Sequence, residues 1–332
     1  MNNQLEPGIK ELVEGFITEG KQCPSTLDIA SRRTGYLSST VLSGNSPNMF
    51  EEFTDELNGI VLKVYKPNNT KGLPITVYFH GGCFISGGFK THEQQLRQIA
   101  SLSNSIVICI QYRLAPESCY PAAHDDVYDA VLAIKEFGSY YGGDTNMIVF
   151  VGDSAGGQLA LTTCLRLKQN QKWLPQKQIL IYPMLDPFGE SKSYVENGTD
   201  YVITANMLLS GFSMYTANLE KDSLSQNSQL NPLVCADFKG LPPTYIITAE
   251  FDPLRDEGEQ CYRQLLNAGV EAYCERYLGV IHGFHQLSGV SASARRCLRK
   301  ISEDIKQATR SKLTRICPFI SFGDKISVSN RS

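Results

Sequence analysis

The sequence predicts an α/β protein with a mostly parallel sheet, and three observations point to this fold class. Short apolar runs rich in β-branched residues alternate with longer segments of helical period, which is the pattern of strand-helix-strand units. The motif Gly-Asp-Ser-Ala-Gly at residues 152–156 stands between an apolar run and a helical segment. Asp252 and His282 each follow a later apolar run. Since parallel strands end at one edge of a sheet, these polar segments are expected to gather there.

The apolar runs and the helical segments follow one another in a regular order. Seven runs are expected to form strands, namely Ile60–Tyr65, Ile75–Phe79, Ile106–Ile110, Met147–Val151, Gln178–Ile181, Thr244–Thr248 and Glu271–Tyr277. Four longer segments are expected to be helices, namely Glu93–Leu102, Asp125–Phe137, Ala155–Lys168 and Asp256–Ala268. The chain thus starts with one strand and continues with alternating strands and helices.

Two regions stand outside this alternation, and we expect both to belong to a cap. They could pack together over the carboxyl edge of the sheet, where open α/β sheets place their ligands; the alternative is that both are peripheral decorations. Within the second region, Thr204–Thr216 has a helical pattern. The expected organisation is an N-terminal cap segment (1–48), a first core part (49–186), a cap insertion (187–231), a second core part (232–311) and a C-terminal extension (312–332).

The composition bounds the class of partner. The 332 residues are 42% hydrophobic and 20% charged, enough for one large domain with an accessory subdomain. The formal net charge is -3 and the sequence pI is near 6.0, without a concentrated basic face. Nucleic acid and anionic membranes are therefore not expected as partners, and a small, uncharged or weakly charged substrate fits better.

The N-terminus and the cysteines suggest a reducing, cytoplasmic setting. Residues 1–20 contain four glutamates where a secretory signal would have a basic start and an apolar run, and no stretch reaches membrane-spanning length. The ten cysteines include no CxxC pair and no Cys/His cluster at zinc spacing. Neither a disulfide scaffold nor a metal site is expected.

The motif at residues 152–156 matches the Gly-x-Ser-x-Gly nucleophile elbow. A serine nucleophile must protrude from a sharp turn between a strand and a helix, so its neighbours must be nearly free of side chains. Gly152 and Gly156 meet that demand, and the following helix start can aim backbone N–H groups at a reacting oxygen. The placement after Met147–Val151 makes Ser154 the candidate nucleophile.

A serine hydroxyl needs a general base and an orienting acid, and in proteins with this elbow they follow in the order Ser, Asp or Glu, His. Asp252 and His282 obey that order and fall after strand-like runs. Asp256 is a rival to Asp252, but its segment has a helical pattern, so it suits a first helical turn. Asp252 is therefore the expected acid.

Three other histidines compete with His282 as the candidate base. His285 could replace it, but Gly283 leaves the imidazole of His282 unobstructed. His124 precedes the candidate acid and is expected to be structural, while His92 is expected at a helix start. His282 remains the expected general base.

The segment His80-Gly81-Gly82-Cys83 follows the expected strand Ile75–Phe79. Backbone N–H groups in such a loop can donate to the oxygen that turns negative when an ester carbonyl becomes tetrahedral, together with the N–H of Ala155. Each donor of this kind can lower the barrier by about 3 kcal/mol. The loop is therefore the candidate oxyanion hole.

The segments HGGC, GDSAGG, DPLRDEG and HGF together resemble the hormone-sensitive-lipase-like esterases, as do Tyr112–Glu117 and Pro121–Asp126. The resemblance runs from about Leu57 to Leu287. It implies the α/β-hydrolase fold with an eight-stranded sheet, a helical cap built from the N-terminal segment and the insertion after Pro187, no cofactor, and activity on short-chain acyl esters.

Carried over by position, the resemblance makes Ser154 the nucleophile, His282 the base and then the acid, and Asp252 the orienting residue. The oxyanion hole maps to Gly82, Cys83 and Ala155, with Gly81 shaping the turn and offering a further donor.

The chain departs from the family's usual HGGG at Cys83. Because a Cβ disfavours positive φ by about 1 to 2 kcal/mol, the turn is expected to keep negative φ there. The Cys83 side chain is expected either to narrow the acyl side of the pocket or to make the protein sensitive to thiol reagents.

These residues predict a serine carboxylesterase that works through an acyl-enzyme. Amide or formamide hydrolysis on the same triad is an open alternative. A non-catalytic small-molecule receptor on this fold is a second one, disfavoured because all three triad residues are present. The acyl and alcohol preferences stay open, as does the oligomeric state, for which a homodimer is one arrangement.

Overall fold

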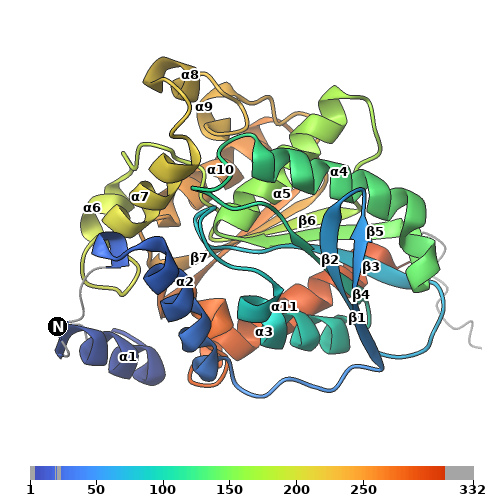
Figure 1. The fold of residues 1–332 in the computed structure, drawn as a ribbon, viewed down its shortest axis with the longest axis horizontal. Coiled ribbons are helices and arrows are strands. Elements are labelled where there is room, and N and C mark those ends of the chain that lie inside the picture. The colour runs from blue at the N-terminus through green and yellow to red at the C-terminus, as the bar shows by residue number, and fades with distance from the viewer. Residues whose placement is uncertain (1–3, 19, 21–23, 311–332) are drawn as a thin grey trace, which may run out of the picture.

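In the computed structural model, residues 4–18, 20 and 24–310 are described. The expected C-terminal extension at 312–332 therefore lies outside the described residues. Figure 1 shows the chain as a central sheet with helices on both faces and a group of helices at one end of the strands.

The sheet has eight strands in the order β1-β2-β4-β3-β5-β6-β7-β8. Their bounds are β1 Glu51–Leu57, β2 Ile60–Lys66, β3 Leu73–Phe79, β4 Ile106–Gln111, β5 Gly143–Asp153, β6 Lys177–Ile181, β7 Thr244–Phe251 and β8 Ala272–Ile281. β2 runs antiparallel to β1 and β4, and all other neighbours are parallel. The α/β class and the mostly parallel, eight-stranded sheet are confirmed.

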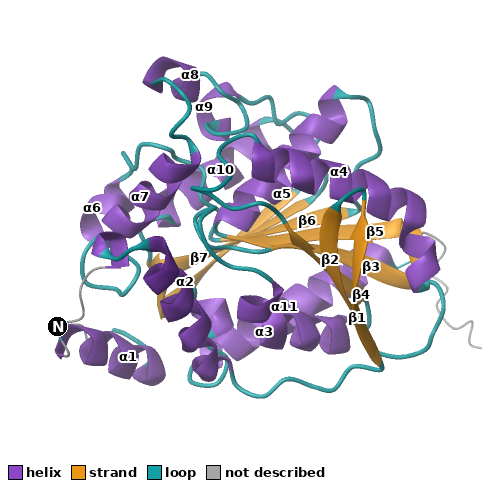
Figure 2. Cartoon of the chain, viewed as in Figure 1, coloured by secondary structure: helices purple, strands orange, loops and turns teal. Residues whose placement is uncertain are grey.

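Five long helices cover the two faces of the sheet (Figure 2). α4 (Ala122–Phe137), α5 (Ala155–Gln169) and α10 (Arg255–Asn267) lie on one face, and α3 (Phe89–Ser103) and α11 (Ala292–Thr309) lie on the other. Consecutive strand residues serve opposite cores, as the period of two requires: Val77 packs with α5, and Tyr78 packs with α3 and α11. Both cores are fully buried, so the strands form a rigid support for the loops at their ends.

The edge strand β1 and the helix α11 were not among the sequence expectations. β1 has the sequence EEFTDEL and is largely exposed, so it lacks the apolar run by which buried strands are recognised. Its hairpin with β2 turns at Asn58-Gly59, both with positive φ (53° and 79°), which is a strong hairpin signal. α11 begins at an N-cap, Ser291, whose side chain accepts from the N–H of Ala294.

The remaining α-helices lie in the two regions assigned to a cap, except α9, which directly follows the predicted cap insertion. They are α1 (Pro7–Thr18), α2 (Ile29–Ser38), α6 (Lys192–Glu196), α7 (Ala205–Tyr215), α8 (Lys221–Ser225) and α9 (Pro232–Cys235). α2 and α7 are joined by Arg32, which donates to Ser210 Oγ (3.2 Å) and to the Met207 carbonyl (3.0 Å).

The N-terminal segment divides into two parts with different surroundings. α1 lies beside the core: the Glu6 N–H donates to the Gly279 carbonyl of β8 (2.8 Å), and Ile9 and Val13 pack into the same core as α11. α2 lies with α7 near the carboxyl ends of the strands (Figure 1). The domain boundaries at 48, 186 and 231 stay a prediction.

Candidate active site

Ser154 lies in the sharp turn between β5 and α5 and has a strained backbone, with φ 55° and ψ -121°. Its glycine neighbours leave no room for a side chain. A Cβ at Gly152 would lie 2.2 Å from the Gly156 carbonyl oxygen, and one at Gly156 would lie 2.0 Å from the Phe79 oxygen. The motif is thus required sterically, because the turn brings β5, α5 and the end of β3 into backbone contact.

The structure brings Ser154, His282 and Asp252 into one hydrogen-bonded chain. His282 Nε2 lies 3.1 Å from Ser154 Oγ, and His282 Nδ1 lies 2.8 Å from Asp252 Oδ2. All three side chains are buried, Asp252 completely. Asp252 follows β7 and His282 follows β8, so adjacent strands deliver them to the edge where β5 ends.

This geometry fits the transfer of a proton from a serine to an imidazole. Asp252 Oδ1 accepts the Leu254 N–H (2.8 Å), which holds the carboxylate while its other oxygen faces the imidazole. The ring centroid of Tyr182 lies 4.5 Å from that of His282, so the Tyr182 ring limits how the imidazole can turn. An imidazolium formed here would be stabilised by the buried carboxylate.

The rival acid and base residues lie elsewhere. Asp256 is in the first turn of α10, accepts the Ser193 N–H (2.9 Å) and pairs with Arg255. His285 is hydrogen bonded to Tyr182 through Nδ1 and to Tyr78 through Nε2 (3.0 Å). Burial lowers the pKa of His285 to about 4, so it stays neutral inside the core.

His124 and His92 also have structural surroundings. His124 Nδ1 is hydrogen bonded to the Tyr215 hydroxyl (2.7 Å), and burial lowers the pKa of His124 to about 3. His92 lies in the first turn of α3, as expected, and is fully buried.

The candidate oxyanion loop presents free backbone donors. Within the described part of the chain, the N–H groups of Gly82, Cys83 and Ala155 have no hydrogen-bond partner. The Gly81 N–H, in contrast, donates to Asp153 Oδ1 (3.0 Å). Gly81 therefore shapes the turn, and its expected role as a further donor is corrected because its hydrogen is already engaged.

The backbone at Cys83 differs from the sequence expectation. Cys83 has φ 53° and Phe84 has φ 64°, so the expectation of negative φ at Cys83 is wrong. Tertiary contacts offset the steric cost: the Phe84 ring stacks on Tyr215 (centroids 4.3 Å apart, 7° between planes), and its carbonyl accepts the Ala115 N–H (2.8 Å). Packing of the next residue decides the turn here.

The Cys83 side chain is buried and lines the cavity beside Ser154. Burial raises the pKa of the Cys83 thiol to about 12, which leaves little thiolate at neutral pH. Of the two expected effects of Cys83, a narrower pocket therefore agrees better with the structure than sensitivity to thiol reagents.

A buried polar cluster beneath the elbow was missed by sequence reasoning. Asp153, next to Ser154, accepts the Tyr78 hydroxyl (2.9 Å), and its Oδ1 lies 3.2 Å from His92 Nε2. Burial opposes ionisation, but the histidines His92 and His285 and the Tyr78 hydrogen bond hold the pKa of Asp153 below its ordinary value. The only signal in the sequence is a carboxylate between Gly152 and Ser154, which does not show where its partners lie.

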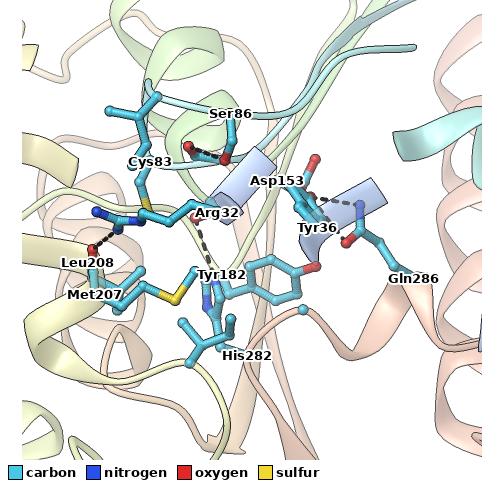
Figure 3. A pocket seen from close by; sticks show the side chains of 15 residues that line it. Arg32, Tyr36, Cys83, Ser86, Asp153, Tyr182, Met207, Leu208, His282 and Gln286 are labelled. Atoms are coloured by element: carbon cyan, nitrogen blue, oxygen red, sulfur yellow. Dashed lines mark hydrogen bonds between the residues drawn. The ribbon is translucent and has the colours of Figure 1, made fainter. Parts of the chain in front are cut away.

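A cavity of about 80 Å³ opens onto Ser154 and His282 (Figure 3). Its lining combines the elbow, the oxyanion loop and the cap helices α2 and α7. Apolar side chains of the cap, namely Ile203, Met207 and Leu208, line it together with Ile85 from the loop after β3. A small organic group fits this space.

Among the described residues, no group of three or more histidine, cysteine or acidic side chains is arranged to hold a metal ion. No helix in the same part of the chain is both long and apolar enough to cross a membrane. The strand order, the elbow and the hydrogen-bonded Ser, His and Asp together define an α/β hydrolase.

Comparison with known proteins gives the family. A family model described as the alpha/beta hydrolase fold matches residues 76–286. The chain is 35% identical over 236 residues to the carboxylesterase NlhH of Mycobacterium tuberculosis, covering 69% of this chain and 72% of the relative. It is 28% identical over 308 residues to ethyl acetate hydrolase of Pseudomonas putida, covering 90% and 96%.

A solved structure agrees with these matches. The hyperthermophilic esterase of the archaeon Pyrobaculum calidifontis superposes with a TM-score of 0.84 at 34% identity, covering 92% of this chain and 98% of that chain. The chain therefore belongs to the α/β-hydrolase family, in its hormone-sensitive-lipase-like group of carboxylic ester hydrolases.

Proposed function

We propose that this protein is a serine carboxylesterase that hydrolyses short-to-medium-chain acyl esters through an acyl-enzyme, with Ser154 as nucleophile, His282 as general base and acid, and Asp252 as orienting acid. The single observation that carries the proposal is the buried chain of hydrogen bonds from Asp252 through His282 to Ser154, at 2.8 Å and 3.1 Å. Family membership supports the reaction class.

In the proposed reaction, His282 Nε2 takes the Ser154 proton while Oγ attacks the ester carbonyl carbon. The free N–H groups of Gly82, Cys83 and Ala155 stabilise the negative oxygen of the tetrahedral intermediate. When the C–O bond to the alcohol breaks, His282 returns the proton to the leaving oxygen. Water, deprotonated by His282, then attacks the acyl-enzyme and releases the acid and Ser154.

The preference for short acyl groups rests on the size of the site. The cavity of about 80 Å³ is closed on the cap side by α2 and α7, and Cys83 narrows it near the elbow. The similarity to a relative named ethyl acetate hydrolase also supports a preference for short acyl groups.

The test is a series of p-nitrophenyl esters from acetyl to decanoyl, measured with the parent protein and with Ser154→Ala. We expect kcat/KM to be highest for the short acyl groups and Ser154→Ala to lose at least about 10³-fold in kcat. Ser302→Ala, which changes a buried serine on α11, is the matched control and should keep the parent kcat.

Two outcomes contradict the proposal: no hydrolysis of any ester by the parent protein, or parent-like activity in Ser154→Ala. A parallel series of p-nitroanilides tests the amide alternative, which gains support only if anilides are cleaved faster than the matching esters.

A further inference from the structure

Arg32 is a buried cation inside the candidate active site. Its side chain comes from the cap helix α2 and lines the same cavity as Ser154 and His282 (Figure 3). The residue is 5% exposed, and no other lysine or arginine in the described part of the chain is buried. A buried charge is costly unless a partner compensates it.

Among the residues that the structure describes, no acidic side chain compensates Arg32. The next residue, Arg33, shows the usual arrangement, since its guanidinium donates to both oxygens of Glu117 (2.8 Å and 2.7 Å). Among the described residues, no carboxylate oxygen lies within 4.0 Å of Arg32. The two carboxylates of the site are engaged elsewhere: Asp252 with His282, and Asp153 with Tyr78, Gly81 and His92.

The Arg32 guanidinium also has hydrogen-bond donors that the structure does not use. It has five N–H groups, of which the structure uses one on Nη1 toward Ser210 and one on Nη2 toward the Met207 carbonyl. Nε is buried and has no hydrogen-bond partner. Joining α2 to α7 needs only neutral donors, so this structural role does not account for the positive charge.

The surroundings of the charge point to an anionic ligand. Apart from Tyr36, whose hydroxyl donates to Gln286 Oε1 (3.1 Å), the other cap residues at the cavity are the apolar Ile203, Met207 and Leu208. The guanidinium therefore acts in a largely apolar medium that strengthens its pairing with an anion. A carboxylate matches the planar guanidinium fork, with two oxygens that can accept parallel hydrogen bonds.

We propose that Arg32 is a specificity-determining residue that binds a carboxylate group of the substrate, so that the preferred substrates are short esters carrying a free carboxylate, such as half-esters of small dicarboxylic acids. This inference rests on the proposed esterase function and deepens it. The carboxylate pairs with the guanidinium while the ester carbonyl lies at Ser154, in the same cavity.

The test uses two pairs of substrates that differ only in charge. Monoethyl succinate and ethyl 4-methylpentanoate place a carboxylate or its neutral isostere on the acyl side. Acetoxyacetate and isobutyl acetate place them on the alcohol side. We expect the parent protein to prefer the charged member of at least one pair by about tenfold or more in kcat/KM, since a hydrogen-bonded ion pair contributes that much.

Substitutions at Arg32 then test whether this residue causes the preference for charged over neutral esters. Arg32→Met should lower kcat/KM for the charged ester by about 10- to 100-fold and leave its neutral isostere within about threefold, while Arg32→Lys should keep part of the preference. Ser210→Ala removes one anchor of the guanidinium but not its charge, so the ratio of charged to neutral rates should stay within about threefold.

Preference of the parent protein for the neutral member of both pairs overturns the inference, and this result does not depend on any variant folding. So does an equal loss on charged and neutral esters in Arg32→Met, which would make Arg32 an anchor between helices only. In either case, hydrolysis of p-nitrophenyl acetate that is lost in Ser154→Ala leaves the proposed esterase function intact. Failure to hydrolyse that ester as well would contradict the function itself.

Discussion

At the scale of single residues, the site depends on groups whose surroundings fix their position and direction. Asp252 is fully buried and is held by the Leu254 N–H and by His282. Asp256, four residues later, lies on the helix surface with Arg255. The two aspartates are close in sequence but differ in what they contact, so they provide a matched pair for mutation.

Asp252→Asn should lower kcat by about 10⁴-fold, because an amide in this place favours the wrong imidazole tautomer and cannot stabilise the imidazolium. Asp256→Asn should change kcat by less than about tenfold, since its carboxylate contacts Ser193 and Arg255 and not His282. Steady-state kinetics on p-nitrophenyl acetate measure both. A larger loss in Asp256→Asn than in Asp252→Asn would reverse the assignment.

Most individual site residues could be predicted from sequence, because the motifs have strict geometric requirements. Ser154 needs flanking glycines, and Gly156 contacts the Phe79 backbone too closely to be anything else. The turn at Cys83 could not be predicted, since its positive φ is held by the stacking of Phe84 on Tyr215, a contact across about 130 residues of sequence. The sequence gives no signal for Arg32 either, because arginine side chains are mostly exposed in folded proteins.

At the scale of elements, the buried strands were predictable and the exposed ones were not. β3, β4 and β5 are apolar runs covered on both faces, which makes them visible in the sequence. β1 can carry charged side chains because it is an exposed edge strand, and the Asn58-Gly59 turn is its only signal in the sequence.

The cap shows why long-range packing limits prediction. Two regions outside the strand-helix alternation were recognised, but their contacts were not. α1 packs beside β8, whereas α2 packs with α7 through Arg32. The same N-terminal segment thus supports the core with one helix and lines the candidate site with the next, and periodicity alone does not reveal this division.

At the scale of the whole molecule, overall charge and local charge differ. The net charge of -3 favours a neutral or weakly charged substrate, while Arg32 supplies a local positive charge in the cavity. Because apolar cap residues surround the guanidinium in the cavity, this local charge is expected to decide which substrate binds.

The whole molecule should also lose stability in acid, because three buried histidines stay neutral in the folded state. Burial lowers the pKa of His80 and His124 to about 3 and that of His285 to about 4, from an ordinary 6.5. The stability of the folded state is not reduced by these histidines above pH 6.5, where they are neutral in both the folded and the unfolded chain. As the pH falls below 6.5, the unfolded chain takes up protons that the folded one does not.

The free energy of unfolding should therefore fall between pH 6.5 and about 4 by up to about 1.4 kcal/mol per pH unit for each histidine. Urea unfolding at several pH values measures this slope. His124→Asn keeps a hydrogen-bonding partner for the Tyr215 hydroxyl and removes one titrating group. The free energy of unfolding of this variant should therefore change less steeply with pH, by up to about 1.4 kcal/mol per pH unit. Equal slopes for parent and variant would show that His124 does not stay neutral as its burial requires.

The central claim is that Ser154 carries the acyl group during turnover, and the most direct measurement is the mass of the protein quenched in acid during hydrolysis of p-nitrophenyl acetate. We expect an acetyl adduct that peptide mapping places on Ser154 and that Ser154→Ala lacks. An adduct on another residue, or turnover of the ester by Ser154→Ala at the parent rate, would contradict the account.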